Sequence, residues 1–205
     1  MRHGKAEKQS GRRADAERRL VQKGRERTRA AALAFSRYLA GAGRIQVWSS
    51  PLARAKQSAE IVAEVLGVAV VEECQEIADG DLKVLLSRTK SAAEDDAIVV
   101  VGHQPFLTEW AEALAGIHIP FKPSAAAGME LKFGKGAARL RWYVHPKAAL
   151  DFSLADKKYS SSGEGADAAG LSAGRPGDAD AGEPPAARRF SAFDDSDGDK
   201  DNYWG

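Results

Sequence analysis

Four consecutive β-branched residues, Ile98-Val99-Val100-Val101, constrain the fold of this chain more than any other segment. A run of this kind, without a polar residue, is typical of a strand that is buried on both faces of a parallel sheet. Gly102 and His103 follow the run, and residues 105–115 have the apolar spacing of a helix. A strand that leads directly into a helix predicts an α/β domain with helices packed on the sheet.

The same alternation of strand and helix patterns extends over residues 1–150. Apolar spacing predicts further helices and strands, namely helices at 21–39, 52–66 and 81–93 and strands at 45–48, 68–71, 129–133 and 138–144. Phe35 and Tyr38 lie on the apolar stripe of the first helix, and Gly134-Lys135-Gly136 is the turn of a closing hairpin. Residues 5–19 are polar and basic and indicate a loop. We therefore predict a three-layer α/β/α domain with a mostly parallel central sheet.

Charge and composition divide the chain at about residue 150. Residues 1–150 hold 24 Lys and Arg against 17 Asp and Glu, whereas residues 151–205 hold 6 against 12, so a net charge of +1 hides a basic and an acidic part. Gly, Ala, Ser and Asp dominate the acidic part, which predicts a disordered tail because too little apolar surface can be buried. Its end, residues 190–204, has a docking peptide as its alternative interpretation. Asp195, Asp197 and Asp199 are spaced as in a calcium loop, but the later glutamate is absent.

Several classes of protein do not fit this composition. The single Cys74 cannot form an internal disulfide, no basic-then-apolar leader opens the chain, and no run approaches eighteen apolar residues. We therefore expect a cytoplasmic protein that binds no membrane. Basic residues near the start lack interleaved aromatics, and an acidic tail would compete with a phosphate backbone, so we expect no nucleic-acid partner.

Two histidines and a few arginines carry the chemistry that the sequence suggests. Imidazole is a competent nucleophile, and guanidinium groups match the oxygens of a phosphoryl group. His103 follows a strand and precedes a helix, where α/β sheets bind ligands, although a loop histidine that caps the helix is the alternative. Arg54 falls in the first turn of a helix, which suits a bound anion better than it suits the helix dipole; a solvent-facing arginine is its alternative. His3 taken alone is interpreted first as an inert surface residue.

Four motifs occur in an order that resembles a known family: Arg2-His3-Gly4-Lys5-Ala6-Glu7, Arg18-Arg19-Leu20-Val21-Gln22-Lys23-Gly24, Ser50-Pro51-Leu52-Ala53-Arg54-Ala55-Lys56-Gln57-Ser58-Ala59-Glu60, and Val101-Gly102-His103-Gln104-Pro105. The chain is similar over residues 1–146 to the histidine phosphatase (phosphoglycerate-mutase-like) superfamily, in particular to its short SixA-type phosphohistidine phosphatases. This resemblance implies a phosphoglycerate-mutase-like fold for residues 1–150.

The resemblance also implies a mechanism without a metal or other cofactor. His3 would be the nucleophile that becomes phosphorylated, and Arg2, Arg18 and Arg54 would bind the phosphoryl oxygens, with His103 completing the pocket. Glu76 is the first candidate for a general acid and Asp81 the next. The expected substrate is a phosphohistidine, for example on a histidine-containing phosphotransfer protein; small phosphorylated metabolites stay open as alternatives.

One departure from the family concerns the start of the chain. Family members begin with an apolar strand that runs into Arg-His-Gly, but here only Met1 precedes Arg2. We expect the missing first strand to leave unpaired backbone groups and an open slot beside residues 98–101. Either the start codon lies upstream, which we favour, or the product is unstable or inactive. A catalytically silent phosphate- or phosphoprotein-binding module is therefore the alternative to an enzyme.

Overall fold

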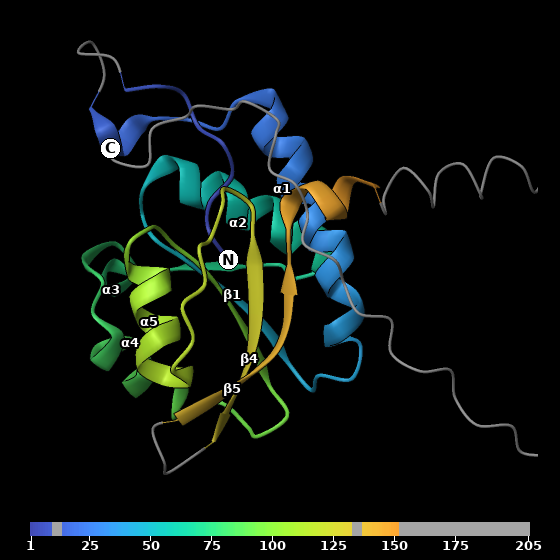
Figure 1. The fold of residues 1–205 in the computed structure, drawn as a ribbon, viewed down its shortest axis with the longest axis vertical. Coiled ribbons are helices and arrows are strands. Elements are labelled where there is room, and N and C mark those ends of the chain that lie inside the picture. The colour runs from blue at the N-terminus through green and yellow to red at the C-terminus, as the bar shows by residue number, and fades with distance from the viewer. Residues whose placement is uncertain (10–13, 133–136, 152–205) are drawn as a thin grey trace, which may run out of the picture. The chain divides into compact units, whose positions relative to one another are not determined.

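The sheet of this protein consists of a parallel and an antiparallel part. The computed structural model describes residues 1–9, 14–132 and 137–151. Strands β1 (Ile45–Ser49), β2 (Val71–Glu73) and β3 (Ala97–Val101) are parallel in the order β2-β1-β3, and β4 (Ala126–Lys132) pairs antiparallel with β5 (Ala137–Val144) (Figure 1). The turn predicted at 134–136 and the tail from residue 152 lie outside the described residues.

Helices pack on both faces of this sheet, which produces three layers. Helices α1 (Gln22–Ser36) and α2 (Ala53–Leu66) build one apolar core, and α3 (Gln75–Asp79), α4 (Leu82–Thr89) and α5 (Phe106–Ala115) build the other. Two neighbours on β1 show the division, because Val47 lies in the first core and Trp48 in the second. Successive side chains of a strand point to opposite faces, so each core covers one face. The predicted three-layer α/β architecture is confirmed.

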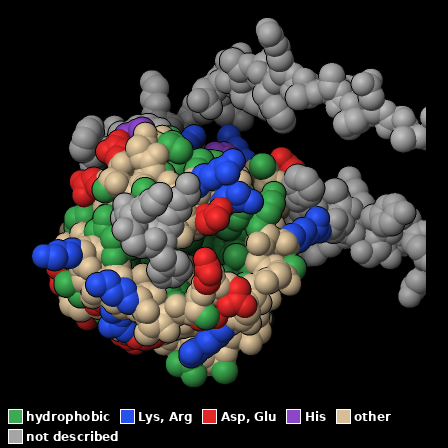
Figure 2. All heavy atoms as spheres, turned by 90° about the horizontal axis from the view of Figure 1, so that it is seen from below, with side chains coloured by type: hydrophobic (Ala, Val, Ile, Leu, Met, Phe, Trp, Pro, Cys, Tyr) green, Lys and Arg blue, Asp and Glu red, His purple; other side chains and the backbone are tan. Residues whose placement is uncertain are grey.

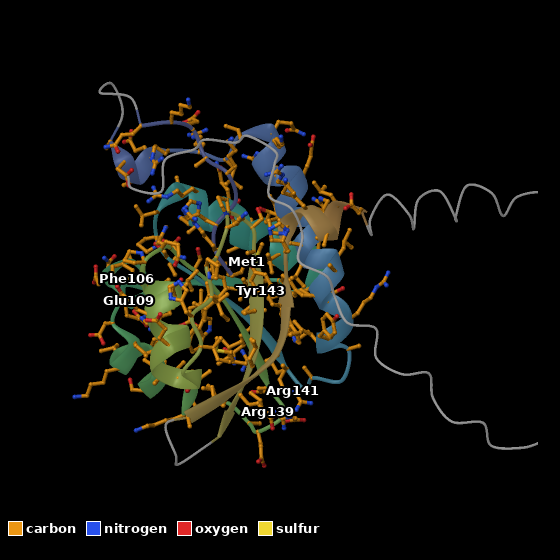
Figure 3. The ribbon with its side chains drawn as sticks, in the orientation of Figure 1. Met1, Phe106, Glu109, Arg139, Arg141 and Tyr143 are labelled. Atoms are coloured by element: carbon orange, nitrogen blue, oxygen red, sulfur yellow. The ribbon has the colours of Figure 1, made fainter. Side chains whose placement is uncertain are left out.

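The first residues of the chain join the two parts of the sheet. The Gly102 amide donates to the Met1 carbonyl at 3.0 Å, the His3 amide donates to the Gly102 carbonyl at 3.0 Å, and the Arg2 amide donates to the Ala125 carbonyl at 2.9 Å. Residues 1–3 therefore lie between β3 and the beginning of β4, and Figure 3 shows Met1 at the centre of the domain. The expected open slot is closed at residues 100–102.

This short pairing also corrects the burial predicted for β3. Of the run Ile98-Val99-Val100-Val101, only Val101 is fully buried, and the other three are half-buried. Residues 1–3 pair beside 100–102 alone, so they do not cover the earlier part of the strand. The Met1 amino group is itself buried and donates to the Val100 carbonyl at 2.7 Å. Burial lowers the pKa of this amino group to about 5.

Several boundaries differ from the predicted ones for local reasons. Strand β2 begins at Val71 rather than at residue 68, because Gly67 (φ 69°) ends α2 and the Val68 amide still donates to the Ala63 carbonyl. Val70 is accordingly 74% exposed. The helix predicted at 81–93 ends at Thr89, and the short α3 was not predicted. Tyr38 is 61% exposed rather than buried.

The remaining helices match their predicted ranges. The pattern over 21–39 corresponds to α1 followed by a 3-10 turn, Arg37–Leu39, and those over 52–66 and 105–115 correspond to α2 and α5. On the face shown in Figure 2, charged side chains of both signs are interspersed with hydrophobic ones. No helix among the described residues is both long and apolar enough to cross a lipid bilayer.

Candidate active site

Three segments end at the same edge of the sheet and carry the predicted site residues. The register pairs Ser49 of β1 with Val101 of β3, and Arg2 forms a bridge with Gly102. His3 and His103 therefore follow neighbouring strand ends, and Arg54 lies in the first turn of α2, just after β1. The carboxyl ends of parallel strands are where α/β proteins bind their ligands, so the topology brings these three side chains together.

The imidazole of His3 is held by a contact at each of its ring nitrogens. Nδ1 lies 2.8 Å from the carbonyl oxygen of Gly4, and Nε2 lies 3.3 Å from the Nε of Arg54. A carbonyl can only accept a hydrogen bond, so Nδ1 carries the proton and donates. Nε2 then holds the lone pair, and it accepts from Arg54. In this tautomer Nε2, and not Nδ1, is the ring nitrogen that could act as a nucleophile.

The buried hydroxyl group of Ser58 and a backbone amide fix the loop that begins at His3. The Gly4 amide donates to Ser58 Oγ at 2.9 Å, and Ser58 Oγ donates to the Arg54 carbonyl at 2.7 Å. One serine on α2 thus connects the His3 loop to the turn of helix that carries Arg54. The Ser124 amide donates to the His3 carbonyl at 3.1 Å from the opposite side. The sequence analysis included Ser58 in the third motif but gave it no role, although its position one helical turn after Arg54 is a signal that it shares that face.

The loop also packs closely against the start of α1. A Cβ atom at Gly24 would lie 2.1 Å from the Lys5 carbonyl oxygen, and one at Gly4 would lie 2.5 Å from Thr28 Oγ1. Only hydrogen fits at either position, so glycine permits the backbones to approach. The Val21 amide donates to the same Lys5 carbonyl at 3.0 Å. The residues that follow His3 are therefore held against α1 by these contacts and against α2 by Ser58.

His103 lies next to His3 and is buried. The centroids of the two rings are 5.1 Å apart. Both ring nitrogens of His103 and the Nε of Arg2 are buried without a hydrogen-bond partner among the described residues. Arg2 is anchored at its other end, because Nη1 donates to the Phe121 carbonyl at 2.9 Å. Buried polar groups normally have partners, so these three nitrogens indicate a place for a polar ligand.

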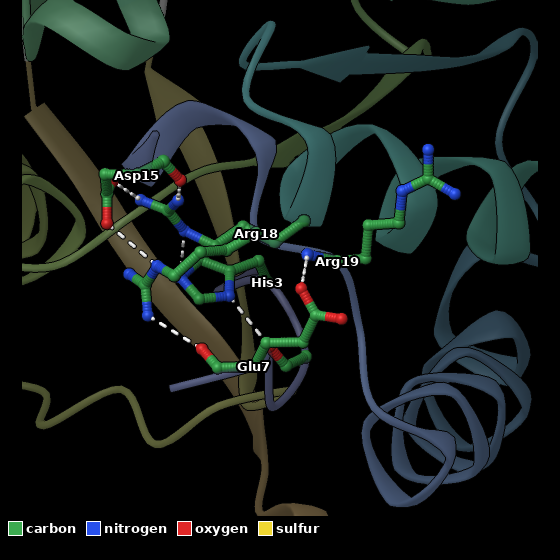
Figure 4. Close-up of polar contacts among 7 residues, drawn as sticks. His3, Glu7, Asp15, Arg18 and Arg19 are labelled. Atoms are coloured by element: carbon green, nitrogen blue, oxygen red, sulfur yellow. Dashed lines mark hydrogen bonds and ion pairs between the residues drawn. The ribbon is translucent and has the colours of Figure 1, made fainter. Parts of the chain in front are cut away.

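Arg18 joins the cluster through a carboxylate that the sequence analysis did not consider. The Nε of Arg18 forms an ion pair with Asp15 Oδ1 at 2.8 Å, and Arg54 Nη2 forms one with Asp15 Oδ2 at 3.1 Å (Figure 4). Arg18 Nη1 also donates to the Glu7 carbonyl at 3.1 Å. The side chain of the neighbouring Arg19 extends away from His3 (Figure 4). The 3-10 turn Asp15–Glu17 therefore lies over the arginines.

The surroundings keep both histidines neutral near pH 7. Burial lowers the pKa of His3 well below its ordinary value; the Gly4 carbonyl opposes this, and the charges of His103, Arg54 and Arg2 add to it. Burial, assisted mainly by the Arg54 charge, lowers the pKa of His103 to about 4. An unprotonated imidazole is the form that can attack phosphorus. The site thus combines two neutral imidazoles with fixed positive groups.

Comparison with known proteins decides the family. The family model described as histidine phosphatase superfamily (branch 1) matches residues 1–93. An uncharacterised protein of Picosynechococcus sp. strain PCC 7002 is 35% identical over 148 residues, which cover 69% of this chain and 86% of that protein. The chain belongs to the histidine phosphatase superfamily.

Solved structures of this superfamily agree in fold. The protein histidine phosphatase SixA complexed with tungstate is 26% identical, with a TM-score of 0.61, and the match covers 72% of this chain and 96% of that one. A SixA from Agrobacterium tumefaciens is 21% identical, with a TM-score of 0.59 and coverages of 71% and 95%. The phosphoglycerate-mutase-like fold expected from the motifs is confirmed.

The two acid candidates in this superfamily member contact groups other than His3. Glu76 lies on α3 and forms an ion pair with Arg88 at 3.2 Å, and the Asp81 side chain accepts from the Val84 amide at 3.0 Å as the cap of α4. Helix α3 does reach the strand end, since a Cβ at Gly102 would lie 2.9 Å from Ile77. A role for Glu76 as general acid stays a prediction. Among the described residues there is no cluster of three or more histidines, cysteines or acids that could hold a metal ion.

Proposed function

We propose that this protein is a phosphohistidine phosphatase that works through a phospho-His3 intermediate. The observation that carries the proposal is the pair of contacts made by His3, with Nδ1 on the Gly4 carbonyl and Nε2 facing the guanidinium of Arg54. A nucleophile beside preorganised positive groups is the arrangement that phosphoryl transfer requires. The SixA relative was solved with tungstate, and this oxyanion supports a phosphoryl site in the same fold.

In the proposed reaction, His3 Nε2 attacks phosphorus as the bond to the substrate nitrogen breaks. Arg2, Arg18, Arg54 and His103 donate to the phosphoryl oxygens, so arginines supply the positive charge that a metal supplies elsewhere. The leaving imidazole takes its proton from water. The hydroxide that this leaves then attacks phospho-His3, which gives inorganic phosphate and returns His3 to its neutral state. Substrate phosphohistidine and one water are consumed for each phosphate released.

The choice of phosphohistidine follows from the leaving group. An alkoxide leaving group needs a general acid, which contributes about 10²- to 10⁴-fold. Glu76 forms its ion pair with Arg88, and Asp81 caps α4, so neither contact is made to His3. A phosphoramidate needs less help, because its nitrogen is basic. The best substrate for such a site is therefore a phosphohistidine, and a histidine-containing phosphotransfer protein is the proposed bearer.

A pair of matched peptides tests this choice. We expect kcat/KM for a phosphohistidine peptide to exceed that for a phosphoserine peptide of the same flanking sequence by at least about 100-fold, the scale of general acid catalysis. Release of inorganic phosphate measures both. Equal rates, or a faster reaction with a small sugar phosphate, would instead favour a phosphatase of metabolites. Binding of vanadate without any turnover would favour a silent binding module.

A further inference from the structure

The acidic side chain of Asp15 contacts two of the arginines from outside the motifs assigned to the site. It lies in the 3-10 turn Asp15–Glu17, and the side chain is 42% exposed. Its two carboxylate oxygens are divided between two cations, with Oδ1 at 2.8 Å from Arg18 Nε and Oδ2 at 3.1 Å from Arg54 Nη2. A single carboxylate thus sits between two guanidinium groups that would otherwise repel each other.

The backbone of Asp15 makes a second contact with the same arginine. Arg54 Nη1 donates to the Asp15 carbonyl oxygen at 2.8 Å. Both terminal nitrogens of Arg54 are therefore held by one residue, while Nε is 3.3 Å from His3 Nε2. A guanidinium group is planar and rigid, so holding two of its nitrogens fixes the direction of the third.

Two hydrogens on these terminal nitrogens remain for a substrate. Guanidinium carries five N–H donors, and the contacts to His3 and to the two Asp15 oxygens use three. Arg54 can thus bind phosphoryl oxygens while Asp15 stays in place. A carboxylate that merely occupied the phosphate position would have to leave before the substrate could bind, and its backbone carbonyl contact would serve no purpose.

We propose that Asp15 is a positioning residue for phosphoryl transfer, which sets Arg54 against His3 and attaches Arg18 to the same cluster. This inference rests on the proposed function. Asp15 acts through the arginines and does not itself touch the reacting atoms. Its carboxylate also offsets the repulsion between the Arg18 and Arg54 charges, and the Asp15 charge raises the pKa of Arg54 against the effect of burial.

Replacement of Asp15 by asparagine tests the proposal with little change in shape. The amide of D15N can accept from only one arginine and turns an N–H₂ group toward the other. We expect kcat with p-nitrophenyl phosphate to fall by about 10- to 100-fold, the cost of a misplaced catalytic group. The Kd for inorganic tungstate should rise about tenfold, although the variant adds net positive charge to the site.

Glu17→Gln is the matched control, because it removes the same charge from the same 3-10 turn. We expect its kcat and its Kd for tungstate to stay within about twofold of wild type.

A titration of the His3 imidazole by NMR separates positioning from charge alone. If Asp15 acts only as a negative charge, its removal lowers the pKa of His3. If Asp15 positions Arg54, its replacement moves the Arg54 Nε–H group away from His3 Nε2. The neutral imidazole then loses a hydrogen bond, and the pKa of His3 rises toward its ordinary value. We expect the rise in D15N and no change in Glu17→Gln, with the His3 signal identified by its absence in His3→Ala.

Three results would overturn the inference. One is unchanged kcat and tungstate affinity in D15N, and another is tighter tungstate binding with kcat retained, which would make Asp15 a competing anion. The third is loss of activity accompanied by a fall of about ten degrees or more in Tm, which would give Asp15 a structural role. The proposed function fails separately: turnover that survives His3→Ala refutes it, whereas an inactive His3→Ala beside a normal D15N refutes only the role of Asp15.

Discussion

Replacement of His3 by alanine is expected to abolish turnover of p-nitrophenyl phosphate, with a fall in kcat of about a thousandfold or more. The reason is that Nε2 is the proposed nucleophile and its tautomer is fixed by the Gly4 carbonyl. Tungstate should still bind within a few-fold of the wild-type Kd, because the arginines remain in place. Initial rates and a tungstate titration measure the two effects.

His118→Ala is the matched control for this variant. His118 is 70% exposed and contacts Glu112 rather than a residue of the site. We expect its removal to leave kcat unchanged. Substantial turnover by His3→Ala would contradict the covalent mechanism, and loss of both turnover and tungstate binding would mean that His3 holds the site together rather than reacting.

Replacement of Arg54 by lysine is expected to lower kcat/KM by about 100-fold or more, although the charge is kept. Lysine has one side-chain nitrogen, so it cannot contact His3 Nε2 together with the Oδ2 and the backbone carbonyl oxygen of Asp15, as Arg54 does. The Ser58 hydroxyl bonds the backbone of residue 54, and this contact should preserve the His3 loop. Steady-state kinetics with p-nitrophenyl phosphate measure the loss.

Arg29→Lys serves as the control for the change of arginine to lysine. Arg29 is exposed and pairs with Glu64 on the surface, where ion pairs contribute little. We expect kcat/KM within about twofold of wild type for this variant. Activity of Arg54→Lys close to wild type would show that charge alone suffices at position 54, and the guanidinium geometry would then have no part in the mechanism.

The part of the site that the sequence predicted is the part that topology dictates. His103 and Arg54 follow strands, and parallel strands end at one edge, so their proximity could be inferred without coordinates. Asp15 could not be found in this way. It lies in a basic loop without an apolar pattern, and its contacts depend on how residues 14–18 fold over α2.

The burial of the central strand shows the limit of pattern analysis in the fold. A run of four β-branched residues predicts coverage on both sides, but coverage depends on the neighbouring strand as well as on the run itself. Residues 1–3 pair only beside 100–102, so Ile98 and Val99 have no such neighbour and are half-buried. The pattern identified the strand correctly, whereas the extent of its burial required the structure.

The most direct test of the account is to trap the phosphorylated protein itself. Wild-type protein is mixed with a phosphohistidine peptide, quenched within the first turnover in alkaline denaturant, and mapped by mass spectrometry, with His3→Ala treated in parallel. The account predicts one added phosphoryl group, on His3, in the wild type and none in the variant. Phosphate release without any phosphorylated protein, or a phosphoryl group on another residue, would contradict it.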